Sequence, residues 1–197
     1  MHFIGITGGV GAGKSFILDH LRDRYGAYVL RTDESAQELM LPGHALHRKL
    51  MENLPASCFQ PDGQIDKKTM ADWMYADQSR IEKVNGLVHP AVIQEVLRQK
   101  DLLLKKGCPY FFVESALLLG SGLDLLLDEC WYIYTSEEIR RSRLKDSRGY
   151  SDAKITSIFK AQLSEEDFRK QCSLVINNNG SREETLMEID RAMHRLQ

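Results

Sequence analysis

A glycine-rich segment near the start of the chain limits its fold more than any other feature. Its residues satisfy the pattern G-x-x-x-x-G-K-[ST], and they are Gly8, Gly9, Val10, Gly11, Ala12, Gly13, Lys14 and Ser15. An apolar, strand-like run at His2–Thr7 precedes the segment, and an amphipathic helical pattern at Lys14–Tyr25 follows it. Strand, glycine loop and helix in this order predict a phosphate-binding loop (P-loop) in an α/β fold.

Each part of the P-loop has a chemical role in binding a nucleotide. Glycines give the backbone conformations that let N–H groups converge on phosphate oxygens. The helix that follows adds its positive end to the same place. In such loops the lysine, here Lys14, reaches the β- and γ-phosphates, and the hydroxyl, here Ser15, is a ligand of Mg²⁺. We therefore predict that Gly8–Ser15 binds ATP together with Mg²⁺.

The remaining chain alternates between strand-like and helical patterns. Strands are predicted at Ala27–Leu30, Tyr110–Val113, Trp131–Tyr134 and Leu174–Ile176. Helices are predicted at Glu34–Met40, Asn85–Lys106, Glu138–Lys145, Ser151–Leu163 and Arg182–Leu196. This alternation predicts an α/β P-loop kinase fold, with a parallel β-sheet flanked by helices.

Residues 44–83 differ in character, because prolines such as Pro55 separate short amphipathic helices there. A strand is possible only for one or two residues near Ile65, so we expect a helical insertion. His44 and His47 have the i, i+3 spacing of a metal pair, but no carboxylate or cysteine completes a ligand set. We expect both histidines to face solvent.

Charge and cysteine usage exclude several classes of protein. The net charge is −2, so no broad basic field exists to collect nucleic acid or an anionic membrane. No basic, apolar leader precedes the first strand, and no apolar run is long enough to span a membrane. We expect a cytoplasmic protein that is a monomer or a weak homo-oligomer. The cysteines, expected to be free and at least half-buried, are Cys58, Cys108, Cys130 and Cys172.

The chain lacks the N-K-x-D stretch that reads guanine and a long strand ending in the D-E of hydrolytic ATPases. An acid, Asp33, follows the second predicted strand instead, where a doubly wound sheet presents side chains to ligands. Asp33 could take a proton from an acceptor hydroxyl, or it could cap the helix Glu34–Met40. Farther along is a basic run that could close over phosphates or form a solvated helix face, made of Arg140, Arg141, Arg143, Lys145 and Arg148.

Several motifs together resemble the dephospho-CoA kinase family, in the family's order from residue 4 to about residue 190. Gly5–Ser15 is similar to the family's G-[IL]-T-G-G-I-G-S-G-K-S opening. Thr32-Asp33-Glu34 falls at its D-x-D, and His89-Pro90 matches its H-P step. Glu114–Leu119 resembles its D-x-P-L-L-F stretch, and its R…Q…N-x-G series is matched by Arg143, Gln162 and Asn178-Asn179-Gly180.

The resemblance implies transfer of the ATP γ-phosphate to the ribose 3′-hydroxyl of dephospho-CoA. It assigns catalytic roles to Asp33 as the base and to Lys14, Arg143 and Arg148. Substrate contacts fall to Asp33, Lys67, His89 and Glu114, and Asn178 would line the adenine end of the ATP site. It also divides the chain into a nucleotide-binding core (1–40, 84–136 and 172–197), a CoA-binding insertion (41–83) and a lid (137–171).

The chain departs from the family pattern at several positions. Arg31 replaces the first Asp of the D-x-D, Lys67 stands for an Arg, Gly120 for a Glu and Ser147 for an Arg that Arg148 could replace. Two other functions stay open: a kinase for another small acceptor, such as a nucleoside monophosphate, and a non-catalytic protein that senses ATP.

Overall fold

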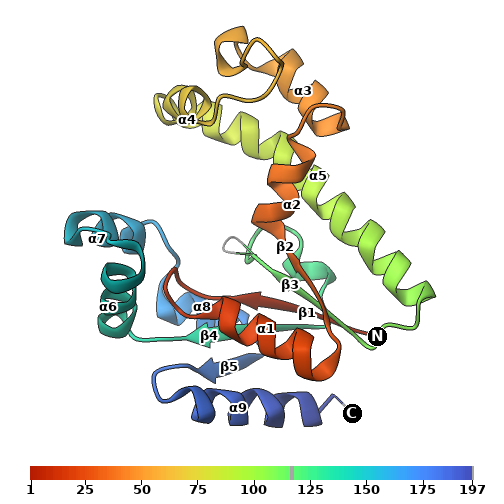
Figure 1. Ribbon diagram of the computed structural model, residues 1–197, viewed down its shortest axis with the longest axis vertical. Coiled ribbons are helices and arrows are strands. Elements are labelled where there is room, and N and C mark those ends of the chain that lie inside the picture. The colour runs from red at the N-terminus through yellow and green to blue at the C-terminus, as the bar shows by residue number, and fades with distance from the viewer. Residues whose placement is uncertain (116–117, 197) are drawn as a thin grey trace. The chain divides into compact units, whose positions relative to one another are not determined.

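The computed structural model describes residues 1–115 and 118–196 (Figure 1). Ala116 and Leu117, which belong to the stretch after Glu114 that resembles the family pattern, lie outside the described residues, as does Gln197. Among the helices that the structure describes, none is both long and apolar enough to cross a bilayer.

The described chain forms two compact units. The first contains Met1–Leu30 and the residues from Leu103 onward, and the second is Arg31–Leu102. In sequence, the boundaries fall at the end of strand β2 (Tyr28–Arg31) and within helix α5 (Gln78–Lys105). We refer to the first as the sheet unit and to the second as the helical unit.

A five-stranded sheet in the order β2-β3-β1-β4-β5 is the basis of the sheet unit. Strand β1 pairs in parallel with β3 and β4, and β4 pairs in parallel with β5. Because β1, β3, β4 and β5 are parallel, their carboxyl ends lie at one edge of the sheet, where ligands bind in such folds. The strands are β1 His2–Thr7, β2 Tyr28–Arg31, β3 Tyr110–Glu114, β4 Glu129–Tyr134 and β5 Leu174–Asn177.

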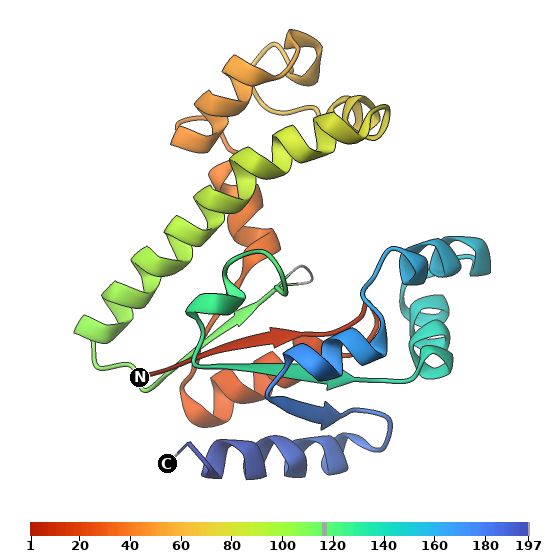
Figure 2. The same ribbon diagram turned by 180° about the vertical axis from the view of Figure 1, so that it is seen from behind.

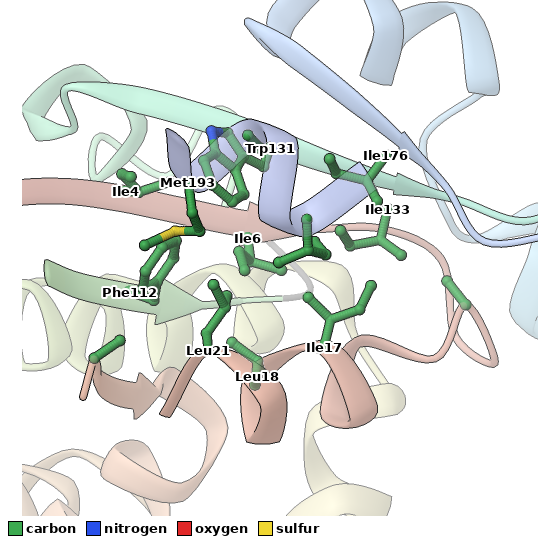
Figure 3. Packing of buried hydrophobic residues seen from close by; sticks show 14 residues of the cluster. Ile4, Ile6, Ile17, Leu18, Leu21, Phe112, Trp131, Ile133, Ile176 and Met193 are labelled. Atoms are coloured by element: carbon green, nitrogen blue, oxygen red, sulfur yellow. The ribbon is translucent and has the colours of Figure 1, made fainter. Parts of the chain in front are cut away.

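Helices α1 and α9 cover one face of the sheet, and α8 lies on the other (Figures 1 and 2). Figure 3 shows the core on the first face, where Ile6 and Trp131 of the sheet pack with Ile17 of α1 and Met193 of α9. On the second face, the Phe168 ring stacks on Tyr132 with 4.7 Å between centroids. The helices of this unit are α1 Lys14–Tyr25, η2 Asp124–Leu126, α6 Glu137–Arg148, α7 Asp152–Lys160, α8 Glu165–Gln171 and α9 Arg182–His194.

The helical unit has a separate core, in which Leu50, Cys58, Met70 and Val84 are buried together. The strand expected near Ile65 is a single antiparallel bridge between Ile65 and Phe59. The helices are α2 Thr32–Leu39, α3 Ala45–Asn53, η1 Ala56–Cys58, α4 Lys67–Tyr75 and α5 Gln78–Lys105, the last of which ends in the sheet unit.

The structure corrects three local expectations. Helix α5 starts at Gln78 rather than Asn85, because Asp77 Oδ1 accepts a hydrogen bond from the backbone N–H of Ser79 and marks the helix start there. Helix α8 was not predicted, although Ser164 caps it by accepting from the N–H of Asp167. His47 is buried instead of facing solvent, since its Nε2 bonds with Gly63 O at 2.8 Å.

Candidate functional site

The P-loop connects β1 to α1 at the carboxyl edge of the sheet. Gly11 and Gly13 have φ of 84° and 86°, in the left-handed region that favours glycine. A Cβ on Gly13 would also overlap with the side-chain amide nitrogen of Asn178. The side chain of Ser15 is exposed in the first turn of α1. The loop therefore has the glycine-dependent backbone and the accessible hydroxyl that the sequence predicts for a nucleotide site.

Lys14 and Glu114 lie together at this edge. Lys14 Nζ donates to Gly8 O at 2.8 Å and lies 3.4 Å from Glu114 Oε1. Both side chains are mostly buried, with exposures of 12% and 15%. Glu114 ends β3, and the parallel register places it opposite Ile6 near the end of β1. The lysine is thus held across the loop by partners that a phosphate could replace.

Asn178 holds the P-loop from the other side. Its Nδ2 donates to Ala12 O at 2.6 Å, and its Oδ1 accepts from the Thr185 hydroxyl at 2.9 Å. Arg143 donates to Asn178 O at 3.1 Å, so the structure brings this arginine of α6 to the loop. Both ends of the Asn178 amide are thus bonded within the protein, one of them to the P-loop.

Arg140, rather than Arg148, is the second arginine at the P-loop. The Arg140 guanidinium is buried, lies 4.1 Å from the Phe159 ring centroid and is so close to Gly9 that a Cβ there would overlap with its Nη1. Burial lowers its pKa, because desolvation disfavours the charged form. Among the described residues, neither Arg140 Nε nor the nearby buried Oε1 of Gln162 has a hydrogen-bond partner. These two side chains are therefore polar groups available to a ligand or to a rearranged loop.

Arg148 has a different setting from Arg140. It lies on the exposed last turn of α6, with its guanidinium 5.9 Å from the Tyr150 ring centroid. The sequence places Arg140 in the basic run that could close over phosphates, but the family resemblance singles out Arg143 and Arg148. Helical spacing alone could have indicated that Arg140 accompanies Arg143 at the P-loop, since the two arginines are three residues apart and share a helix face.

We expect Gly9→Ala to weaken ATP binding about tenfold, since the added methyl would force a buried guanidinium to move, and such overpacking costs about 1–3 kcal/mol. Isothermal titration calorimetry would measure the dissociation constant. Gly86→Ala is the matched control, because a Cβ there meets no atom within 4 Å. The double variant Gly9→Ala/Arg140→Ala should bind ATP better than Gly9→Ala alone. Equal or weaker binding by the double variant would contradict the proposed overlap.

Asp33, Lys67 and His89 belong to the helical unit. Asp33 is exposed in the first turn of α2, where the helix dipole favours a carboxylate. It does not cap the helix, because the cap position is occupied by Arg31. His89 is half-buried in the interior of α5 beside Pro90.

Lys67 starts α4 and lines a cavity of about 370 Å³ within the helical unit. Asp66 caps this helix by accepting from the N–H of Thr69 at 2.9 Å. Most of the other lining side chains are apolar, with Gln37 and Gln64 as further polar groups. The unit therefore contains a largely apolar cavity with one lysine at its wall.

Comparison with known proteins decides the family. A family profile described as dephospho-CoA kinase matches residues 2–184. The chain belongs to the dephospho-CoA kinase family. A dephospho-CoA kinase of Geobacillus kaustophilus is 31% identical over 186 residues, which are 94% of this chain and 92% of that protein.

Solved structures agree with the fold of a dephospho-CoA kinase. A Thermus thermophilus protein has a TM-score of 0.84 and 26% identity, with complete coverage of both chains. The dephospho-CoA kinase from Campylobacter jejuni has a TM-score of 0.72 at 18% identity, covering 98% of this chain and 96% of its own. The sequence-based prediction of a P-loop kinase fold is thus confirmed.

Proposed function

We propose that this member of the dephospho-CoA kinase family transfers the γ-phosphate of ATP to the ribose 3′-hydroxyl of dephospho-CoA. The observation that carries the proposal is the family match over residues 2–184, combined with a P-loop whose shape depends on glycine. Gly8–Ser15 would bind the phosphates through backbone N–H groups, and Lys14 would leave Gly8 O and Glu114 for a phosphate oxygen.

The residues at the loop also fit Mg²⁺. The exposed Ser15 hydroxyl is a hard oxygen donor, and Mg²⁺ usually binds through few protein ligands together with substrate phosphates and water. Glu114, at the same edge, could hold a water of the ion. When bound, Mg²⁺ would neutralise charge that develops on the β- and γ-phosphates.

Asp33 would accept the proton of the ribose 3′-hydroxyl. At the same time the hydroxyl oxygen would bond to the γ-phosphorus, and the bond between the γ-phosphorus and ADP would break. Its exposed position leaves the carboxylate accessible to an acceptor. Arg143, held at the P-loop by Asn178 O, would bind phosphate oxygens. We assign the segment 137–171, which carries the exposed Arg148, to a lid, and His89 to acceptor binding.

The insertion 41–83 would hold the CoA moiety, with the apolar cavity taking the apolar part of the pantetheine arm. Lys67 at the cavity wall would bind an acceptor phosphate, although it offers a point charge where an Arg offers a bidentate fork.

Filling the cavity tests this assignment. We expect Ala71→Phe to raise the KM for dephospho-CoA about tenfold, since about 1.4 kcal/mol of acceptor binding would be removed, and to leave the KM for ATP unchanged. Ala76→Phe, at the end of the same helix and away from the cavity lining, is the matched control. Steady-state kinetics with each substrate varied in turn gives both constants. An unchanged acceptor KM in a stably folded Ala71→Phe protein would contradict the assignment.

The reaction itself is tested by incubating the protein with ATP, Mg²⁺ and dephospho-CoA and measuring CoA by chromatography. We expect CoA and ADP in equal amounts. Nucleoside monophosphates serve as rival acceptors in parallel reactions. Tight ATP binding with no CoA formed would contradict the proposed acceptor, and phosphorylation of a rival would redirect the assignment.

A further inference from the structure

Two cysteines of the sheet unit lie side by side although they are 42 positions apart in the sequence. Cys130 Sγ and Cys172 Sγ are 3.2 Å apart. Cys130 lies at the start of β4, and Cys172 is the C-terminal cap of α8, just before β5. Two hydrogen bonds join the chain at Cys130 to the residue after Cys172. The N–H of Ser173 donates to Cys130 O at 2.9 Å, and the N–H of Cys130 donates to Ser173 Oγ at 3.2 Å.

The geometry permits a covalent bond between the two sulfurs. A disulfide bond is about 2.0 Å long, so the sulfurs must approach by about 1 Å. Strands β4 and β5 are paired in parallel with Trp131 opposite Leu174, so Cys130 immediately precedes the first pair and Cys172 lies two residues before it. Small rotations of the side chains can therefore close the bond while the sheet stays in register.

The two thiols differ in environment and in acidity. Cys130 is 8% exposed, and Cys172 is half-buried. The hydrogen bond between them lowers the pKa of Cys172 and raises the pKa of Cys130, whose burial raises its pKa further. The thiolate is the reactive form of cysteine, so Cys172 is the nucleophile of the pair and Cys130 is the resolving thiol.

We propose that Cys130 and Cys172 form a redox-active dithiol that a peroxide oxidises to an intramolecular disulfide. The Cys172 thiolate attacks one peroxide oxygen, the O–O bond breaks, and a sulfenic acid and hydroxide form. Cys130 then attacks the Cys172 sulfur, and the departing hydroxide takes the Cys130 proton to leave as water. A small thiol reductant reverses the reaction by thiol–disulfide exchange.

The disulfide would join the two ends of a segment that contains α6, α7 and α8. A cross-link of this kind constrains the unfolded chain and typically stabilises a protein of this size by about 5–10 °C in melting temperature. The P-loop lies outside the cross-linked segment, whereas Arg140 and Arg143, which reach the loop from α6, lie inside it. The proposal does not depend on which acceptor the kinase uses.

The test uses the reduced, full-length protein, which has four cysteines. Hydrogen peroxide is added in steps, free thiols are counted, and unreduced peptides are analysed by mass spectrometry. We expect two thiols to disappear together, a linked peptide pair containing Cys130 and Cys172, a mass lower by two hydrogens, and full reversal by dithiothreitol. Cys108→Ser, which replaces a half-buried cysteine elsewhere in the chain, should behave like wild type, whereas Cys172→Ser should form no link.

A second measurement on the wild-type protein avoids any effect of substitution on folding. With limiting iodoacetamide at neutral pH, Cys172 should be alkylated faster than Cys130, because Cys172 is the more exposed of the two and the hydrogen bond between the thiols lowers its pKa while raising that of Cys130. Oxidation of Cys172 to sulfinic acid without a link to Cys130 would overturn the proposal. Equal alkylation rates, or a disulfide that forms only between molecules, would also overturn it.

Discussion

Asp33→Asn should lower kcat for phosphate transfer to dephospho-CoA by about 10²–10⁴-fold, the usual contribution of a general base. Asparagine preserves the size of the side chain and removes its ability to accept a proton. The KM for ATP should change by no more than about twofold, because the proposed nucleotide contacts come from the P-loop. Single-turnover kinetics with saturating substrates would measure the chemical step separately from product release.

Glu34→Gln is the matched control for Asp33→Asn. Glu34 follows Asp33 in the same first turn of α2, is exposed, and pairs at 3.7 Å only with Arg31 among the ion pairs of the described residues. The Glu34→Gln variant loses the same charge near the same helix end as Asp33→Asn, and we expect it to keep the wild-type kcat. Equal losses in both variants would assign the effect to charge near α2, and an active Asp33→Asn enzyme would exclude Asp33 as the base.

Lys14→Ala should reduce kcat/KM for ATP by about 10²–10³-fold, as expected when one preorganised group that stabilises transferred charge is removed. The Glu114 carboxylate, 3.4 Å from Lys14 Nζ, would then face the phosphates without its cation. We therefore expect Lys14→Ala/Glu114→Gln to bind ATP more tightly than Lys14→Ala, since a like-charge repulsion is removed. The double variant should still have low kcat.

Lys145→Ala controls for the loss of one positive charge in the sheet unit. Lys145 is on α6 and pairs with Asp152 at the surface, where such a pair contributes little to stability. We expect its kinetics and melting temperature to match wild type. A Lys14→Ala protein with normal kcat/KM and a normal melting temperature would contradict the role given to the lysine.

The sequence predicted those parts of the structure that depend on neighbours along the chain. Strand His2–Thr7 and helix Lys14–Tyr25 have the predicted bounds, because a buried apolar run, positive-φ glycines and the cap at Gly26 are local signals. Helix α9 also starts at the predicted Arg182, where Ser181 and Glu184 form a reciprocal capping box.

Features that depend on distant neighbours were not predictable in the same way. The burial of His47 depends on Gly63 O, and the position of Arg140 depends on Gly9 and Phe159. Helix α8 is short and highly charged, so it lacks the apolar periodicity that reveals longer helices, and one buried residue, Phe168, holds it to the sheet.

The hydrogen bond from Asn178 Nδ2 to Ala12 O has a consequence for folding during synthesis on the ribosome. The two residues are 166 positions apart, and at 5–20 residues per second the second follows the first by about 8–33 s. Throughout that interval a nascent chain has its glycine loop but lacks the amide, the Thr185 hydroxyl and β5 that fix it. The P-loop therefore lacks these stabilising contacts until synthesis has passed Thr185.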